Sequence, residues 1–375
     1  MTTRNTITRN MSTRRRFVAQ AGALAAAAFV STSRTRSLAA AAKKKLGFAL
    51  CGLGGLATGQ IAPALQKTQN CRLAGIITGN PAEAASWKTQ YGITDKSIYG
   101  YDTMHRMADN ADIDVVYVLT PNALHLDNAL AAAKAGKHVF CEKPMEISVE
   151  RCQQMIDAVK AAGRMLGVGY RCQYEPNHLE CVRIAREQDF GALKIIDAHF
   201  SNQTEPPGWR LKRALAGGGP LMDLGIYALQ VTRYLTGEEP VWISATTTQG
   251  DPVRFSEVEE SVLWQARFPG GAISNCSSSY NAAPVGYFRA VAERGWFSLD
   301  PAFNYGGIHG MRSDGKPIEL PPIDQFAAEM DDFAQCIMEK KRSKVSGEEG
   351  LRDVTIMTAI YESARTGRPL ELHLS

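Results

Sequence analysis

Residues 46–57 read LGFALC followed directly by GLGGLA, an apolar run that ends in a glycine-rich turn. The run predicts a strand in the middle of a sheet, and the residues after the turn predict a helix to about Gln66. Gly52, Gly54 and Ala57 supply the pattern GxGxxA. The first glycine permits a tight turn, the second lets a backbone approach a pyrophosphate, and the small alanine lets helix and strand pack closely.

This turn predicts a dinucleotide site at the start of the first domain. The free N–H groups and the positive dipole at the start of the helix favour phosphate groups. We expect the cofactor to contact the whole turn, which consists of Gly52, Gly54, Gly55, Leu56 and Ala57. A glycine-rich turn alone is a weak signal, so the prediction depends on the elements around it.

The sequence downstream of the turn alternates short apolar runs with helical stretches. We expect strands over residues 71–77, 114–120, 138–141 and 165–169, and helices over residues 81–91, 124–135 and 149–162. Strands that alternate with helices of this length form βαβ units and a parallel sheet. Residues 43–172 are therefore predicted to form a doubly wound parallel sheet of the Rossmann type.

The pattern changes after about Glu175, where long strands follow one another. The segment 261–268 places Val262, Trp264, Ala266 and Phe268 on one face and Leu263, Gln265 and Arg267 on the other. Further strands are expected over residues 193–202, 241–248, 272–280, 288–292 and 296–299, with helices over 221–235, 325–339 and 351–366. Residues 173–375 are predicted to form an α+β domain on a large, largely antiparallel sheet with one open face. The last helix is expected to pack back on the first domain.

The N-terminal 42 residues have the pattern of an export signal. Two arginines, Arg14 and Arg15, precede Arg16, Phe17 and an apolar, alanine-rich run from residue 19 to residue 30, and small residues follow. This order predicts a twin-arginine signal peptide, a periplasmic location and passage through the twin-arginine translocase. The apolar run is too short to span a bilayer, and we find no other membrane segment.

The composition gives no support for a nucleic-acid partner or for a metal site. The formal net charge of +4 becomes −3 without the seven arginines of the first 42 residues, so it gives no case for nucleic-acid binding. The eight cysteines include no CxxC pair, and we expect them to be small buried hydrophobic residues rather than metal ligands.

The end of the second predicted strand bears on the choice between NAD and NADP. An NAD site needs a carboxylate there to hold the ribose 2′-hydroxyl, whereas the segment is Thr78-Gly79-Asn80-Pro81. The Thr78 hydroxyl could donate to a 2′-phosphate, which favours NADP. Glu83 lies one turn into the next helix and could weaken this preference, and Lys88 could restore it.

Three further residues suggest chemistry. Lys143 follows a predicted strand at its carboxyl end, where ligands lie in open α/β sheets. Asp223 and Tyr227 are four residues apart on a predicted helix, and the glycines of residues 217–219 before them would let a backbone approach a ligand closely. A surface lysine in a turn, an aspartate that favours the dipole in the first turn of a helix and an amphipathic tyrosine would explain the same residues without any function.

The motifs together resemble the Gfo/Idh/MocA family. They are residues 52–57, Glu142-Lys143-Pro144, residues 169–174, Trp209-Arg210, residues 217–219, Asp223 to Tyr227, residues 347–350 and residues 361–369. Within the family, a tyrosine at the position of Tyr227 resembles the motif of the glucose–fructose and aldose–aldose oxidoreductases, whereas most members have a histidine there. The resemblance extends from about Leu46 to the end of the chain.

The resemblance implies a role for each residue. Tyr227 would exchange a proton with the sugar, Lys143 and Asp223 would position sugar and cofactor, and Arg171 and Tyr174 would line the sugar pocket. Besides the turn, Thr78 and Lys143, cofactor contacts would come from Thr120, Asn122, His125, Glu142, Arg171, Trp209 and Arg210. A nearby ammonium is expected to lower the pKa of the phenol toward that of a usable base.

The resemblance also implies an activity. One aldose is oxidised to its lactone and a second sugar is reduced to a sugar alcohol, by ping-pong kinetics with tightly bound NADP. The open sheet face predicts a homodimer or a homotetramer. An NAD-dependent glycosidase, a simple NADP aldose dehydrogenase and a non-catalytic sugar sensor remain as alternatives.

Overall fold

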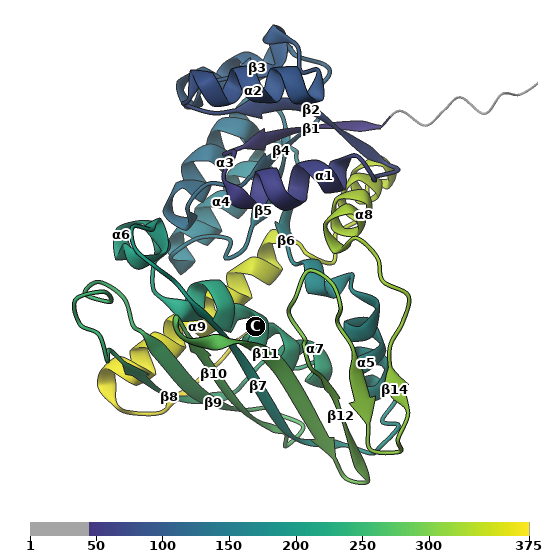
Figure 1. Ribbon diagram of the computed structural model, residues 1–375, viewed down its shortest axis with the longest axis vertical. Helices are drawn as coiled ribbons and strands as arrows, with labels where there is room; N and C mark the ends of the chain where they lie inside the picture. The colour runs from purple at the N-terminus through teal and green to yellow at the C-terminus, as the bar shows by residue number, and fades with distance from the viewer. Residues whose placement is uncertain (1–44, 375) are drawn as a thin grey trace, which may run out of the picture. The chain divides into compact units, whose positions relative to one another are not determined.

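The first described domain is built on a six-stranded parallel sheet. The computed structural model describes residues 45–374, so the predicted signal peptide lies outside the described residues. The strand order is β3(Ile98–Tyr99), β2(Cys71–Ile77), β1(Leu46–Cys51), β4(Val115–Val118), β5(His138–Glu142) and β6(Leu166–Gly169) (Figure 1). This 3-2-1-4-5-6 order is that of the Rossmann fold and confirms the predicted doubly wound sheet.

The strand order reverses between β1 and β4, and the glycine-rich turn begins there. Gly52 follows β1 with φ +94°, a left-handed conformation that a side chain would strain. A helix follows as a π-helical turn, Ala57–Ile61, and then α1(Ala62–Leu65). The other helices of this domain are α2(Pro81–Tyr91), α3(His125–Lys134) and α4(Val149–Ala161). The sequence did not predict β3 or the 3-10 helix Tyr101–Asp109.

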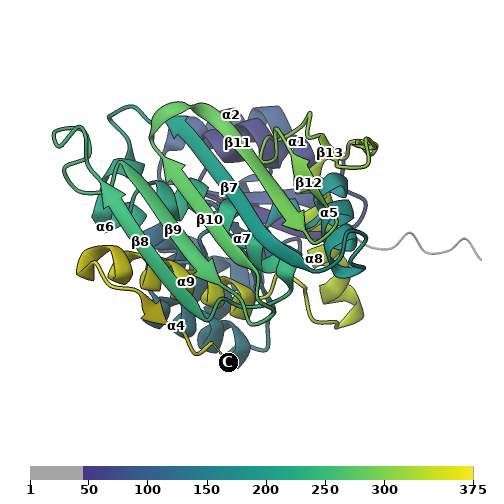
Figure 2. The same ribbon diagram turned by 90° about the horizontal axis from the view of Figure 1, so that it is seen from below.

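The second sheet has nine strands and one parallel pair, β7 with β10. Its order is β14(Pro317–Ile318), β13(Gly310–Arg312), β12(Gly295–Leu299), β11(Asn281–Ala292), β7(Leu193–Gln203), β10(Ile273–Ser279), β9(Ser261–Arg267), β8(Trp242–Thr248) and β15(Leu370–Glu371). Figure 2 shows these strands side by side with helices behind them on one face. In β9, Trp264 is buried and Leu263 and Gln265 are exposed, which confirms the predicted faces.

The helices of the second half are α5(Pro176–Arg186), α6(Arg213–Ala216), α7(Ile226–Thr236), α8(Gln325–Glu339) and α9(Gly347–Thr366). Of these, α5, α7 and α9 pack on the second sheet, and α8 packs on the first domain. Helix α9 packs on α4 and on β8, and Phe333 of α8 stacks on Phe140 of β5. Residues of the two domains therefore share one hydrophobic core.

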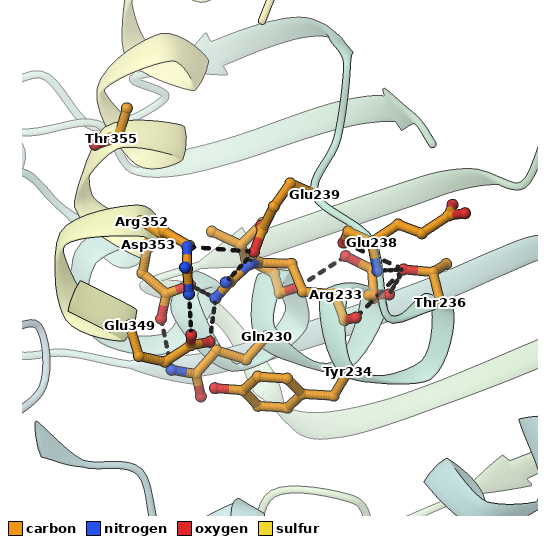
Figure 3. Close-up of polar contacts among 12 residues, drawn as sticks. Gln230, Arg233, Tyr234, Thr236, Glu238, Glu239, Glu349, Arg352, Asp353 and Thr355 are labelled. Atoms are coloured by element: carbon orange, nitrogen blue, oxygen red, sulfur yellow. Dashed lines mark hydrogen bonds and ion pairs between the residues drawn. The ribbon is translucent and has the colours of Figure 1, made fainter. Parts of the chain in front are cut away.

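A buried cluster of charges ties α7 to α9 (Figure 3). The Arg233 guanidinium donates to both carboxylate oxygens of Glu239 at 2.6 Å and to Asp353 at 2.6 Å, and it lies 2.9 Å from Glu349. Gln230 donates to Asp353 at 2.7 Å. Each charge has partners, which is the condition under which buried ions are tolerated.

The described residues give no sign of a membrane span or a metal site. No helix among residues 45–374 is both long and apolar enough to cross a bilayer. The same part of the chain has no group of His, Cys, Asp and Glu side chains that could hold a metal ion. The eight cysteines are free thiols, and all except the partly exposed Cys336 are buried.

Candidate active site

A cavity of about 900 Å³ lies between the carboxyl ends of the first sheet's strands and the inner face of the second sheet. Most of the residues singled out in the sequence line it: Gly54, Gly55, Leu56, Ala57, Thr120, Asn122, His125, Glu142, Lys143, Arg171, Trp209, Arg210, Asp223 and Tyr227. Three do not line it, namely Gly52, Thr78 and Tyr174. The fold thus gathers segments more than 150 residues apart around one space.

The glycine-rich turn offers open backbone to this cavity. A Cβ placed on Gly54 or on Gly55 would meet no atom within 4 Å, so a ligand could approach both residues. A Cβ on Gly52 would lie 3.1 Å from the Thr120 side chain. Gly52 shapes the turn, and the residues after it form the cavity wall.

The end of β2 differs from the sequence prediction. Asn80 caps α2 by accepting from Ala82 and Glu83, so the helix starts at once and brings the Glu83 carboxylate back to β2. The Thr78 hydroxyl donates to that carboxylate at 2.5 Å. A carboxylate therefore does lie at the end of β2, contrary to the expectation for that segment, and it is that of Glu83, the residue expected to weaken the preference for NADP. Lys88 lies 2.5 Å from Asp95, with which it forms an exposed ion pair.

Asp223 is the centre of a charged group at the other end of the cavity. Lys143 Nζ donates to the backbone oxygen of Asp223 at 2.5 Å and lies 3.1 Å from its carboxylate. Arg210 Nε donates to Asp223 Oδ2 at 2.7 Å, and the Tyr280 hydroxyl donates to the same oxygen at 3.2 Å. Burial by itself would raise the pKa of Asp223, but Lys143 and Arg210 outweigh it and hold that pKa well below its usual range.

Asp223 occupies a different kind of helical turn from the one predicted. The expected helix begins with a π-helical turn, Leu221–Gly225, and only Tyr227 lies in the regular helix α7. The wider turn leaves the Asp223 backbone oxygen to Lys143. The two side chains still line the same cavity.

Tyr227 is held between two cations. Arg171 Nε donates to its hydroxyl oxygen at 3.2 Å, and Lys143 Nζ lies 4.7 Å from the centre of its ring. Burial raises the pKa of the Tyr227 phenol, and Arg171 opposes this only in part. The expectation of a lowered pKa is therefore wrong for the free protein, because desolvation of the phenolate exceeds the attraction of the cations.

Arg171 acts as an anchor rather than as an open ligand-binding group. Its guanidinium lies over the rings of Tyr227 and Tyr305, at 4.8 and 4.7 Å from their centres. It donates to the backbone oxygens of Phe303 and Asn304 and, at 2.7 Å, to the side chain of Gln325. Two of its hydrogen bonds, to Phe303 and Asn304, thus fix the loop that closes the cavity.

Tyr174 lies away from the cavity. The short 3-10 turn Arg171–Gln173 directs it toward α8, where its hydroxyl donates to Asp332 at 2.9 Å. Lys344 Nζ covers its ring at 3.7 Å from the ring centre. The structure therefore brings Arg171 to Tyr227 and separates Tyr174 from both.

His125 and Asn122 hold loops of the cavity wall. The buried His125 ring lies between the backbone oxygen of Thr120, at 2.8 Å, and that of Pro144, at 3.1 Å. Asn122 donates to the backbone oxygen of Ala216 at 2.9 Å. Since Pro144 follows Lys143 directly, His125 fixes the loop that carries this lysine.

The three glycines of residues 217–219 approach protein atoms rather than a ligand. A Cβ on Gly218 would lie 2.0 Å from the Tyr361 hydroxyl, and one on Gly219 would lie 2.3 Å from the backbone oxygen of Glu259. The Glu259 carboxylate accepts from the Gly219 N–H at 2.9 Å and from Tyr361 at 2.8 Å. This close packing fixes the start of the turn that carries Asp223.

Helix α9 links the two halves of the cavity from behind. A Cβ on Gly350 would lie 2.9 Å from Met145 Cβ, and Met145 is two residues after Lys143. One turn later, Asp353 binds Arg233 of α7, the helix that carries Tyr227. The first turns of α9 thus set the spacing between the Lys143 loop and α7.

The sequence did not single out several residues of the cavity wall. They are Phe200 to Gln203 on β7 and Thr204 after it, Pro284 to Gly286 on β11, and Asp300, Pro301, Phe303, Asn304, Tyr305 and Phe326. Tyr280 was missed as a partner of Asp223. These residues come from two inner strands of the sheet, a loop and the start of α8, without a local motif, so only the fold brings them together.

Comparison with known proteins agrees with this geometry. Residues 46–170 match the family model described as "Oxidoreductase family, NAD-binding Rossmann fold", and residues 178–298 match the model of the GFO/IDH/MocA C-terminal domain. The chain belongs to the Gfo/Idh/MocA family. The resemblance found in the sequence is thereby confirmed, together with the class of NAD(P)-dependent oxidoreductases.

Individual members of the Gfo/Idh/MocA family align with nearly the whole described chain. The structure of aldose–aldose oxidoreductase from Caulobacter crescentus, complexed with glycerol, is 41% identical and covers 88% of this chain and 100% of its own, with a TM-score of 0.85. D-xylose 1-dehydrogenase [NADP(+)] from Haloarcula marismortui is 28% identical over 87% of this chain and 92% of its own. 1,5-anhydro-D-fructose reductase from Ensifer adhaerens is 26% identical over 86% and 97%.

Proposed function

We propose that the protein is an NADP-dependent sugar oxidoreductase that oxidises an aldose to its lactone and reduces a second sugar to a sugar alcohol. The observation that carries this proposal is the placement of Lys143, Asp223 and Tyr227 in one cavity with the open glycine turn. The 41% identity to an aldose–aldose oxidoreductase supports the class of substrate.

The residues present fit a bound dinucleotide. The open backbone at Gly54 and Gly55 and the start of the following helix suit a pyrophosphate, and the cavity continues from there to Lys143. The nicotinamide cofactor, when bound, accepts a hydride from one sugar and gives it to the next. We infer NADP rather than NAD because D-xylose 1-dehydrogenase [NADP(+)] from Haloarcula marismortui aligns with 87% of the chain. The Glu83 carboxylate at the end of β2 opposes this preference.

In this reaction Tyr227 takes the proton of the C1 hydroxyl in the oxidation and returns it to the carbonyl oxygen in the reduction. The hydrogen bond from Arg171 stabilises the phenolate, and the Lys143 ammonium over the ring acts in the same sense. The raised pKa of the Tyr227 phenol keeps this residue protonated in the free protein, so it can donate a proton in the reduction. Asp223 holds the Lys143 ammonium at the reacting end.

Export and retention of the cofactor belong to the same proposal. The pattern of the first 42 residues supports export of a folded protein by the twin-arginine route, after the cofactor has been bound inside. A periplasmic enzyme has no NADP pool to exchange with, so the two sugars must react in turn on one bound cofactor. Replacement of Arg14 and Arg15 by Lys is expected to trap the protein in the cytoplasm. Unchanged export of this variant would contradict the proposed route.

The outer face of the nine-stranded sheet supports a homo-oligomer. Its exposed apolar side chains include Ile195, Leu263, Ile273, Val285 and Tyr287. A second copy related by a two-fold axis would bury this face. The protein would then be a homodimer, or a homotetramer that contains such dimers. Light scattering at micromolar concentration tests this assembly, and a monomer would contradict it.

The test of the activity uses the purified protein without added nucleotide. Acid release should yield NADP, and a pair of sugars should be converted to lactone and sugar alcohol in equal amounts. A protein that is free of nucleotide and turns over only with added NADP would be a simple aldose dehydrogenase. Release of nitrophenol from a nitrophenyl glycoside without net oxidation would instead indicate a glycosidase.

A further inference from the structure

A second, smaller group of acids lies behind the cavity wall, and the proposed reaction does not use it. Tyr117 of β4 lies between Glu142 of β5 and Glu329 of α8, and all three side chains are buried. The Tyr117 hydroxyl oxygen is 2.6 Å from Glu142 Oε1 and 3.2 Å from Glu329 Oε1. Glu142 lines the cavity next to Lys143, whereas Glu329 does not.

The number of hydrogens limits the charge of this group. A phenol has one hydrogen to donate, so it cannot donate to two carboxylates at once. The distance of 2.6 Å to Glu142 falls in the range of a hydroxyl donating to an ionised carboxylate, whereas the distance of 3.2 Å to Glu329 does not. The contact with Glu329 is then a hydrogen bond only if Glu329 carries a proton and donates it to the Tyr117 oxygen.

The surroundings of the two acids decide which of them is neutral. Glu142 Oε2 accepts from the backbone N–H of Lys143 at 3.3 Å, and the Lys143 and Arg171 cations face it. Glu329 Oε2 is buried without a hydrogen-bond partner, and Glu142 and Asp324 add negative charge around it, which Arg171 opposes. Burial raises the pKa of both carboxyls. Lys143 and Arg171 oppose this rise at Glu142, whereas the charge of Glu142 adds to it at Glu329.

We propose that Glu329 is a neutral carboxylic acid that donates to Tyr117, and that this chain holds Glu142 as an oriented carboxylate on the cavity wall. Glu329 is therefore a positioning residue, because it acts on the site through Tyr117 and Glu142. Gln325, one turn earlier on α8, accepts from Arg171 at 2.7 Å. The first turns of α8 thus support both Lys143, through Glu142, and Tyr227, through Arg171.

The protonation state can be measured without cofactor or sugar, so this test is independent of the proposed function. A protonated carboxylic acid has a carbonyl stretching band in the infrared that a carboxylate lacks. Difference spectra between the parent and E329Q are recorded at about pH 8, where Asp353, with a pKa of about 6, is ionised. We expect the parent to show one such band that E329Q lacks and that E142Q retains. E339Q, on the same helix but at its exposed end, is the control and should retain the band.

Two results of the infrared experiment would overturn the proposal. A band that persists in E329Q would mean that Glu329 does not carry the proton. A band lost in E142Q and retained in E329Q would place the proton on Glu142 instead.

The activity of two different variants of Glu329 gives a second test of its role as a hydrogen-bond donor. The amide of E329Q can donate to the Tyr117 oxygen as the acid does, whereas the side chain of E329L cannot. If the proposed function holds, E329Q should keep the kcat of the parent and E329L should lower it, with both variants folded by circular dichroism. Equal loss in both folded variants would contradict a role as hydrogen-bond donor.

Discussion

Arg171 Nε donates a hydrogen bond to the Tyr227 hydroxyl oxygen at 3.2 Å, and both side chains are buried at the inner end of the cavity. The same guanidinium also holds the loop of Phe303 and Asn304. One buried cation therefore orients the proposed acid–base group and closes the wall around it.

Removal of this cation should shift the pH dependence of sugar oxidation. Arg171 lowers the pKa of Tyr227 against the larger effect of burial, so in R171M that pKa should rise further. Oxidation needs the phenolate, and the rising limb of kcat against pH should therefore move to higher pH. R210M removes a cation that contacts Asp223 rather than Tyr227 and should leave the limb in place. An unmoved limb in folded R171M would contradict the role of Arg171.

Removal of the Tyr227 hydroxyl should abolish most of the rate. General acid–base catalysis typically supplies a factor of about 10²–10⁴, so Y227F should lose activity on that order while it still binds cofactor. Y234F makes the same change on the same helix away from the main cavity, and it should stay close to the parent. Activity of Y227F within a few-fold of the parent would remove Tyr227 from the mechanism.

Glu83 should weaken the binding of NADP. Its carboxylate holds the Thr78 hydroxyl at the end of β2, where a 2′-phosphate would meet its negative charge. E83Q should therefore bind NADP about tenfold more tightly, with little change for NAD, since removal of one like charge near a surface is worth about 1 kcal/mol or more. Titration of both nucleotides measures this, with D157N of α4 as a control. An equal change for NAD and NADP would count against a 2′-phosphate near Glu83.

The cluster around Arg233 should contribute strongly to stability. R233M leaves the buried carboxylate of Asp353 without its cation, whereas Glu239 and Glu349 keep Arg352. Loss of one partner of a buried ion pair costs about 3–5 kcal/mol. R365M breaks an exposed pair on α9, which is worth about 0–1 kcal/mol. Urea unfolding compares the two variants, and equal losses would contradict the role of the cluster.

Much of the fold could be predicted because its signals are local. The helix Gln325–Glu339 and the strand Cys71–Ile77 have the predicted bounds, since each has a clear apolar pattern. The helix Pro81–Tyr91 also has them, because the Asn80 cap starts it and the left-handed Gly92 ends it. The short strands β3, β13, β14 and β15 have two or three residues each and no such pattern. Strand β11 begins at Asn281, seven residues before the predicted start, because its first part is mostly exposed.

The site was predictable where a motif supplies its residues, and not where a contact depends on how a helix starts or joins residues distant in sequence. Lys143, Asp223 and Tyr227 belong to recognisable motifs and meet as expected. The pairing of Thr78 with Glu83 depends on how Asn80 starts α2, and the contact of Arg171 with Gln325 joins residues 154 positions apart. The raised pKa of Tyr227 follows from burial, which motifs do not report.

The most direct test of the central claim is the stoichiometry of products made by the purified protein without added nucleotide. The account predicts that the protein carries NADP and converts a pair of sugars to lactone and sugar alcohol in a one-to-one ratio over many turnovers. A single turnover per protein, or conversion only while NADP is supplied, would contradict it.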